Sequence, residues 1–241
     1  MKKIILISYI IFMLFCFISC DKPPQEGNNE EKNETIEYIS GYENIKNANK
    51  GDLISASGIV SAIMRLDDRI DMYIQNDEGG YYVYNYTNKN SSIKVGNKIL
   101  VTGNKGLYAS RIQFEHPKIR IISKEVLTIE PIDITELIKN GDFKSEEFNK
   151  LNNKLVIVKG AIFIDDASNG MYSFNVGDNS FKVYLSQMSR WCESDVVDEL
   201  HDKITESRIR EKSVTITGIL SLYPTPHCIY MMQKNSIVFD E

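Results

Sequence analysis

The feature of this 241-residue sequence that most constrains its fold is an internal repeat. Three segments of the first half have counterparts, in the same order, in the second half. The pairs are SGIVSAI (57–63) with KGAIFID (159–165), MYIQNDEGGYYVY (72–84) with MYSFNVGDNSFKVY (171–184), and KILVTGNKGLY (98–108) with SVTITGILSLY (213–223). A further run rich in β-forming residues ends each copy, so each copy supplies about five short strands. The repeat therefore predicts two similar β-domains in tandem.

The order of strands and turns within a copy predicts a barrel. In the first copy a strand, a hairpin turn at NDEGG (76–80), a third strand, a gap and a second hairpin turn at GNKG (103–106) follow one another. This order resembles the five-stranded OB barrel. The motif YIQNDEGGYYVY followed by VTG is similar to the extracellular OB-type modules found in bacterial lipoproteins and beside the catalytic domains of secreted nucleases. The resemblance implies a fold, and it does not imply an activity.

The two copies differ by one insertion. From Tyr184 to Gly218 the second copy spans 34 residues, whereas the matching interval of the first copy, Tyr84 to Gly103, spans 19. The inserted segment 194–212 carries apolar residues four apart, which is typical of a helix that packs on one side. We expect an all-β chain with short helices. Residues 35–125 would form the first OB-type barrel, and residues 131–241 the second, with the helix between its third and fourth strands.

The N-terminal segment has the pattern of a secretory signal. Lys2 and Lys3 precede an apolar run from Ile4 to Ile18, which is too short to span a membrane as a helix. Ser19 and Cys20 resemble the lipobox of bacterial lipoproteins, although Phe17 stands where leucine is usual.

The resemblance to the lipobox implies a signal peptide over 1–19, a lipid on Cys20 and a tether over 20–34 whose polar composition predicts disorder. Plain secretion with cleavage nearby is the alternative. With the lipid anchor, the chain would lie in the bacterial cell envelope, periplasmic or at the cell surface, with the membrane as a partner through its lipid.

Two cysteines remain once Cys16 leaves with the signal and Cys20 carries lipid. Cys192 and Cys228 could form a disulfide in an oxidising compartment, or each could stay a buried thiol.

The stretch YYVYNY (81–86) suggests a ligand-binding face. Residues two apart on a strand share a face, so if Tyr81 and Val83 point into the barrel, the other tyrosines point out. The outward face of strands two and three, with the adjoining loops, is where OB barrels bind oligonucleotides and oligosaccharides. The candidate ligand-binding residues are Tyr73, Tyr82, Tyr84, Tyr86, Arg65, Arg69 and Lys105. The alternative is that these tyrosines pack against a neighbouring domain or a partner.

Charge limits the ligand classes. The chain carries 28 basic and 33 acidic residues, which argues against indiscriminate binding of polyanions. Residues 50–124 contain 11 basic and 7 acidic residues, and residues 131–241 contain 12 and 17. Nucleic-acid binding therefore stays open for the first copy.

The sequence carries no recognisable catalytic or metal-binding motif. His116, His201 and His227 stand apart from one another in the sequence. The sequence contains no zinc-type cysteine pair, no serine elbow and no phosphate-binding glycine loop. We therefore expect no enzyme, no metal and no cofactor. The predicted function is a lipid-anchored binding protein for single-stranded nucleic acid or an oligosaccharide. The alternative is an envelope scaffold whose barrels bind a protein partner.

Overall fold

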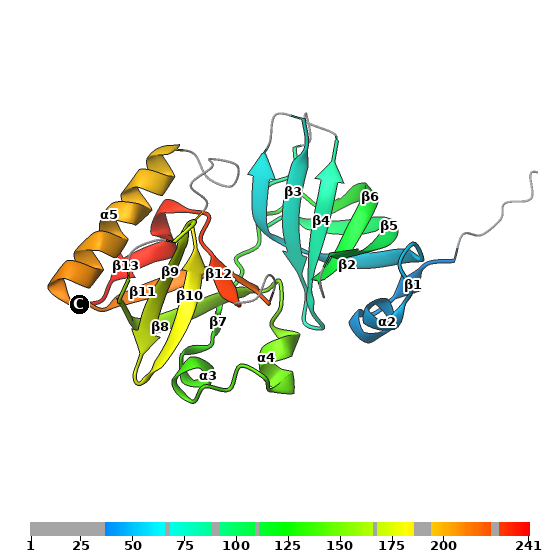
Figure 1. Cartoon of the computed structure of the whole chain (residues 1–241). Coiled ribbons are helices and arrows are strands. Elements are labelled where there is room, and N and C mark those ends of the chain that lie inside the picture. Colours follow the sequence, from blue (N-terminus) through cyan, green and yellow to red (C-terminus); the bar gives the residue numbers. More distant parts are fainter. Residues whose placement is uncertain are drawn as a thin grey trace, which may run out of the picture. The chain divides into compact units, whose positions relative to one another are not determined.

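Two consecutive closed five-stranded barrels make up the described part of the chain, as the repeat predicts (Figure 1). The computed structural model describes residues 37–65, 68–87, 92–108, 111–165, 168–185, 194–222 and 227–241. The predicted signal peptide and tether, Cys20 among them, lie outside the described residues, and so does Cys192. None of the described helices is long and apolar enough to cross a membrane.

The first barrel has the strand arrangement of an OB fold. Its strands are β2 (Leu53–Arg65), β3 (Ile70–Gln75), β4 (Gly80–Tyr86), β5 (Lys98–Tyr108) and β6 (Arg111–Ser123). They follow the order β2-β3-β4-β6-β5, the pairing of β2 with β5 closes the barrel, and β4 runs parallel to β6. Before them, β1 (Ile39–Ser40) pairs with β2, and α2 (Tyr42–Asn47) follows β1.

The second barrel repeats this arrangement. Its strands are β8 (Leu155–Phe163), β9 (Met171–Val176), β10 (Asn179–Tyr184), β11 (Val214–Ser221) and β12 (Cys228–Tyr230). The pairing of β8 with β11 closes the barrel, and β10 runs parallel to β12. The helix α5 (Ser194–Arg210) lies between β10 and β11 in sequence, as the insertion predicts. The remaining elements are β7 (Ile132–Asp133), α3 (Thr135–Lys139), α4 (Glu146–Lys150), the 3-10 helix η1 (Lys234–Ser236) and β13 (Ile237–Phe239).

Alternation along β4 and β10 fills the two barrel interiors. Tyr81 and Val83 are buried in the core of the first barrel, and their counterparts Phe181 and Val183 are buried in the core of the second. The predicted inward register is therefore confirmed in both copies.

The predicted hairpin at NDEGG is present between β3 and β4. The side-chain oxygen Oδ1 of Asn76 accepts hydrogen bonds from the backbone N–H groups of Glu78 and Gly79, at 3.0 and 2.9 Å. A Cβ at Gly79 would lie 1.9 Å from the ring of Tyr42, so only glycine fits there.

The predicted hairpin at GNKG is wrong, because β5 continues through it to Tyr108. A Cβ at Gly103 would lie 2.7 Å from the carbonyl oxygen of Glu115, and one at Gly106 would lie 2.5 Å from the Glu115 side chain. The two glycines therefore permit close packing of β5 on β6. The connection between these strands falls at residues 109 and 110, outside the described residues.

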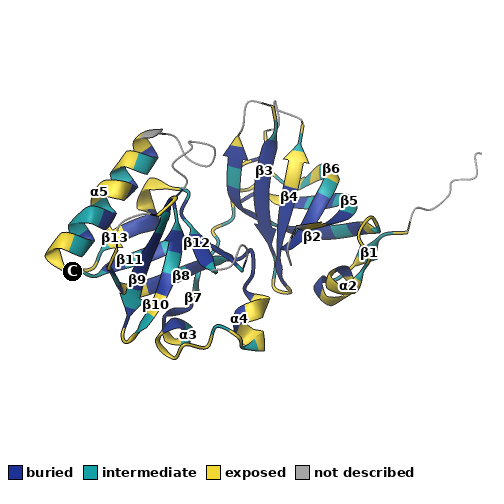
Figure 2. Ribbon diagram, in the orientation of Figure 1, coloured by how far each residue is buried: buried dark blue, intermediate teal, exposed yellow. Residues whose placement is uncertain are grey.

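The two barrels contact each other directly within one compact unit, Glu37–Glu241. The backbone N–H of Leu155 donates to Oε1 of Gln75 at 2.7 Å, and Lys154 Nζ donates to the carbonyl oxygen of Asp77 at 3.2 Å. Figure 2 shows β3 buried almost throughout and β4 buried over its first half, which matches this contact.

Candidate functional site

Two of the predicted ligand-binding tyrosines are covered by the second barrel. Tyr73 and Tyr82 point out of the first barrel, as the register predicts, yet only 0% and 2% of their surfaces are exposed. They form a cluster with apolar side chains of both barrels, namely Ala62 and Met64 from the first and Leu155, Ile219, Tyr230 and Met232 from the second. The prediction that these two rings stack on a ligand is therefore wrong, and the alternative of packing against a neighbouring domain holds for them.

Polar groups complete this buried contact. The guanidinium of Arg111 lies 3.8 Å from the ring centroid of Tyr82 and donates to the hydroxyl of Tyr73 at 3.2 Å. The hydroxyl of Tyr82 donates to Oδ2 of Asp71 at 2.8 Å. Burial raises the pKa of both tyrosines above the ordinary value, and for Tyr82 the charge of Asp71 raises it further. Both hydroxyls therefore stay protonated and serve as hydrogen-bonding groups of the contact.

Tyr84, Arg69 and Arg65 remain at the rim of this cluster. Tyr84 is 37% exposed, and the guanidinium of Arg69 lies 5.5 Å from its ring centroid. Arg69 also pairs with Asp71 at 3.4 Å and Asp68 at 3.6 Å, and Arg65 donates to the carbonyl oxygen of Ile93 at 2.7 Å. Structural contacts thus engage both arginines, while Tyr84 keeps an accessible ring.

Tyr86 does not continue the outward row, and a β-bulge is the reason. Ile70 pairs with Tyr86 whereas Met72 pairs with Val83, so β4 has one extra residue between these pairs. Asn85 takes up the extra residue with a φ of 60° and donates its N–H to Asp71 at 2.8 Å. The alternation shifts by one, and Tyr86 packs against the core of the first barrel.

Lys105 is not a loop cation, because β5 continues through its position. It is 2% exposed, and its Nζ donates to the carbonyl oxygen of Lys46 at 2.7 Å and to that of Ala48. Burial lowers the pKa of Lys105 from its ordinary value, and the charge of Asp52 opposes that shift. Its ammonium group holds the end of α2 to the barrel and is not available to a ligand.

Of the two cysteines predicted either to pair or to stay separate, Cys228 is a free thiol that is 1% exposed. Burial raises its pKa to about 12, so it is inert as a nucleophile. Its proposed partner Cys192 lies outside the described residues.

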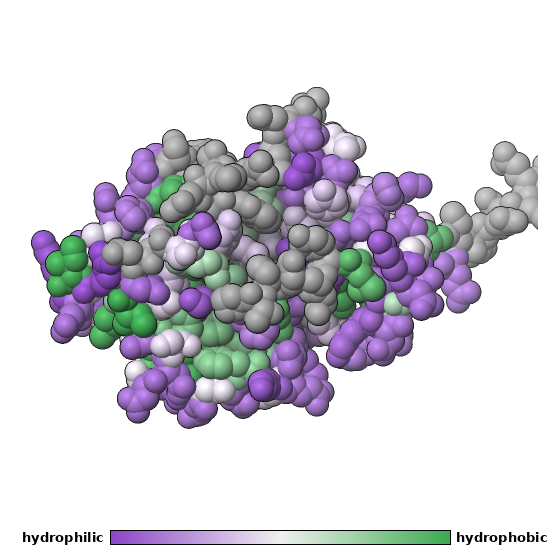
Figure 3. Space-filling model, viewed as in Figure 1, coloured by the Kyte–Doolittle hydropathy of each residue, from purple (hydrophilic) through white to green (hydrophobic). Residues whose placement is uncertain are grey.

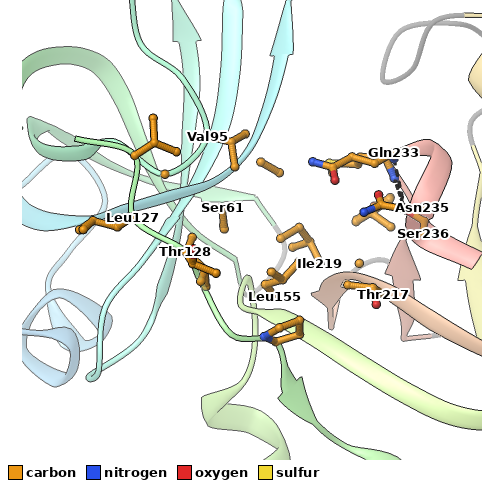
Figure 4. Close-up of a pocket in the computed structure, with 18 residues that line it drawn as sticks. Ser61, Val95, Leu127, Thr128, Leu155, Thr217, Ile219, Gln233, Asn235 and Ser236 are labelled. Atoms are coloured by element: carbon orange, nitrogen blue, oxygen red, sulfur yellow. Dashed lines mark hydrogen bonds between the residues drawn. The ribbon is translucent and has the colours of Figure 1, made fainter. Parts of the chain in front are cut away.

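A cavity of about 410 Å³ lies between the barrels, beside the covered tyrosines. Figure 4 shows labelled side chains on the two sides of this space: Ser61 and Val95 from the first barrel and Thr128 from the connecting segment on one side, and Gln233 and Asn235 from the second barrel on the other. The volume falls in the range of small-ligand sites. This cavity is therefore a candidate site, and none of the predicted site residues lines it.

Hydrogen bonds fix the cavity walls. Gly96, with a φ of 89°, donates its N–H to the carbonyl oxygen of Val60 at 2.8 Å and accepts from the N–H of Leu127 at 2.9 Å. On the other wall, the hydroxyl of Ser236 accepts from the N–H groups of Met232 and Gln233 at 3.3 and 3.2 Å. These bonds tie the first barrel to the connecting segment on one side of the cavity and hold the turn around Ser236 on the other.

The chemistry of the lining is uncharged. None of its 18 described residues is Asp, Glu, Lys, Arg or His. Hydroxyl and amide groups, such as those of Thr128, Thr217 and Asn235, alternate with aliphatic surface, as at Val95 and Met232. Elsewhere in the described ranges, no three His, Cys, Asp or Glu side chains gather as a metal ion would require.

The residues of the cavity escaped the sequence analysis for a physical reason. They come from loops and strand ends of both copies, and nothing in their local pattern brings them together. The one available signal was the segment between the barrels, 124–131, whose Val126, Leu127 and Ile129 are more apolar than a solvated linker requires.

Comparison with known proteins gives only weak similarity. No protein-family model and no curated protein matches the chain. Among solved structures, a tetrameric p202 HIN2 domain is 11% identical, with 80% of this chain and 96% of that chain covered and a TM-score of 0.36. An Ifi202 HINa domain in complex with 20-base-pair double-stranded DNA is 9% identical, with 77% and 94% covered and a TM-score of 0.32. A replication protein A heterotrimer bound to single-stranded DNA is 9% identical, with 86% and 51% covered and a TM-score of 0.31. Likeness at this level says nothing about the ligand of the present chain.

Proposed function

We propose that this chain is a lipid-anchored, non-catalytic binding protein of the bacterial cell envelope, and that its two barrels hold an uncharged oligosaccharide in the cavity between them. The observation that carries the proposal is the cavity of about 410 Å³ whose described lining holds no charged side chain. The anchor is supported by the sequence around Ser19 and Cys20.

The lining favours an oligosaccharide over single-stranded nucleic acid. Binding of a phosphate backbone gains most of its affinity from Lys and Arg, and none lines the cavity. Stacking of several bases needs a row of aromatic rings, and Tyr230 is the only aromatic residue of the described lining. Sugar hydroxyls, in contrast, both donate and accept hydrogen bonds, and so do the amide of Asn235 and the hydroxyl of Thr128.

A glycan panel tests the proposal directly. Residues 21–241 are screened against neutral and acidic oligosaccharides, and Thr128→Val and Asn235→Ala are compared with the native chain. Each removes one hydrogen-bonding group that bonds to no other side chain or backbone group among the described residues, so we expect each to weaken binding by about 3- to 10-fold. Asp202→Ala, an exposed polar truncation on α5 outside the lining, is the matched control and should leave affinity unchanged.

Other outcomes assign other functions. Binding of a single-stranded oligonucleotide that weakens steeply with salt would replace the oligosaccharide by nucleic acid. If neither class binds and the chain draws one stoichiometric protein from solubilised membranes, the scaffold alternative replaces both. For the anchor, Cys20→Ala should release the protein from the membrane fraction, and retention there would refute the lipid.

A further inference from the structure

The outward face of β5 and β6 concentrates positive charge on the first barrel. Thr102 on β5 pairs with Lys118 on β6, and Leu100 pairs with Arg120, so these two cations point the same way on one strand. Lys98 extends the row on β5, and we call Lys98, Lys118 and Arg120 the cationic face. All three are exposed, and Figure 3 shows mainly hydrophilic residues on the visible side of the first barrel.

These three cations have no acidic partner among the described residues. No carboxylate of the described ranges lies within 4.0 Å of their nitrogen atoms. Glu115 shares the outward side of β6, but it accepts a hydrogen bond from Gln113 at 2.9 Å and its carboxylate lies toward Gly106, away from Lys118. The charge of the cationic face is therefore free to attract an anionic surface.

We propose that the cationic face docks on the anionic headgroups of the lipid bilayer. Two exposed aliphatic side chains support a membrane over a nucleic acid as the occupant, since Leu53 is 40% and Ile122 is 46% exposed in the same sheet. Aliphatic groups beside cations are the combination that binds interfacial lipid. None of the three cations has an aromatic neighbour on β5 from Lys98 to Asn104 or on β6 from Lys118 to Ile122, so base stacking has no platform there.

The N-terminal end of the described residues also supports docking of the cationic face on the membrane. Glu37 is the first described residue, and β1 follows it. Strand β1 pairs with Ile54 and Ser55 of β2, and β2 in turn pairs with β5. Glu37 therefore adjoins the sheet that carries the cationic face, about 14 Å from β6 at the usual strand spacing. With the proposed lipid on Cys20, a weak contact becomes intramolecular and gains from a millimolar effective concentration.

The test measures whether the face meets the bilayer. Glu37–Glu241 forms one compact unit, so residues 21–241 contain the whole of it. A synthetic two-chain lipid is ligated to residue 21, which makes the result independent of natural lipidation. An environment-sensitive dye is placed through Ile122→Cys in a Cys192→Ser background. The matched position is Val238→Cys on β13, an aliphatic strand residue that is 53% exposed.

On vesicles of phosphatidylglycerol and phosphatidylcholine, iodide quenching should fall at position 122 and stay unchanged at position 238. Vesicles of phosphatidylcholine alone, or 0.5 M salt, should abolish the fall. Each cation near an anionic surface raises the docking equilibrium constant by a factor of about five. Lys118→Gln with Arg120→Gln should therefore lower that constant by about 25-fold. Lys144→Gln with Lys150→Gln removes the same charge elsewhere and should leave docking intact.

Three results would overturn docking on lipid: no change at position 122, an equal change at position 238, or the same change on uncharged vesicles. Binding of a 20-nucleotide oligothymidine that is lost with Lys118→Gln and Arg120→Gln would assign the face to nucleic acid instead. None of these outcomes affects the oligosaccharide proposal, which the glycan panel decides separately.

Discussion

At the scale of single residues, Arg111 shows how this protein accommodates a charge in the contact between two barrels. Its side chain is 8% exposed, its guanidinium lies against the ring of Tyr82, and it donates to the hydroxyl of Tyr73. Arginine suits such a place better than lysine, because its charge is delocalised over a plane that matches the flat ring. Arg111 thus keeps the two rings in place beneath the second barrel.

Truncation of Arg111 should therefore destabilise the fold. We expect Arg111→Ala to lower the free energy of unfolding by about 2–4 kcal/mol, since a buried hydrogen bond from a charged group and a cation–π contact are lost together. Urea unfolding followed by circular dichroism measures this. Arg120→Ala, an exposed arginine on the same strand, should change stability by less than about 0.5 kcal/mol. Equal effects of the two substitutions would show that Arg111 contributes no more to the free energy of unfolding than an exposed arginine does.

The buried tyrosines should make stability fall at high pH. Burial raises the pKa of Tyr81 and of Tyr230 from 10.0 to about 12. Because the folded state holds these protons more tightly than the unfolded state, their contribution is complete below pH 10 and is lost as pH rises towards 12. Urea midpoints measured from pH 8 to 12 should decline only above pH 10, and Tyr81→Phe should make that decline shallower. A decline of unchanged steepness in Tyr81→Phe would exclude this residue as a source.

At the scale of elements, the sequence predicted the strands because their pattern is local. Repetition and alternation placed β2 to β4 and β8 to β10, and the spacing difference located α5. The predictions that proved wrong concern residues whose role depends on contact with a neighbouring strand. Gly103 and Gly106 look like turn residues, yet they leave room for β6, and Asn85 inverts the direction of Tyr86 through a bulge.

The bulge at Asn85 can be tested by changing its backbone preference. Asn85 has a φ of 60°, which β-branched residues strongly disfavour. We expect Asn85→Val to lower the free energy of unfolding by about 1–2 kcal/mol. Asn85→Gly should retain native stability, because glycine reaches this conformation without steric cost. Thermal unfolding of the three proteins measures the difference, and equally stable Val and Gly variants would mean that the strand straightens without cost.

At the scale of the whole molecule, the duplication explains both the covered tyrosines and the cavity. The outward side of strands β3 and β4, which OB barrels use for ligands, is here occupied by the second barrel. Where the two curved barrels part, beside Ser61 and Thr217, the cavity remains. Neither consequence follows from the pattern of one copy, because the covering residues lie more than 70 positions away in sequence.

The contact between the barrels should make them unfold together. Ile219 is 1% exposed and belongs to the inter-barrel cluster, while the core of the second barrel is built from other residues such as Ile216 and Leu220. Ile219→Asp therefore buries a carboxylate in the contact while it leaves both barrel interiors intact, and it should weaken the coupling by about 3 kcal/mol or more. Scanning calorimetry should show one transition for the native chain and two for the variant. Val238→Asp, exposed on β13, should keep a single transition at nearly the native temperature. If Ile219→Asp also unfolds in one step, the barrels are coupled through the connecting segment and its bond to Gly96, and not through the aromatic cluster.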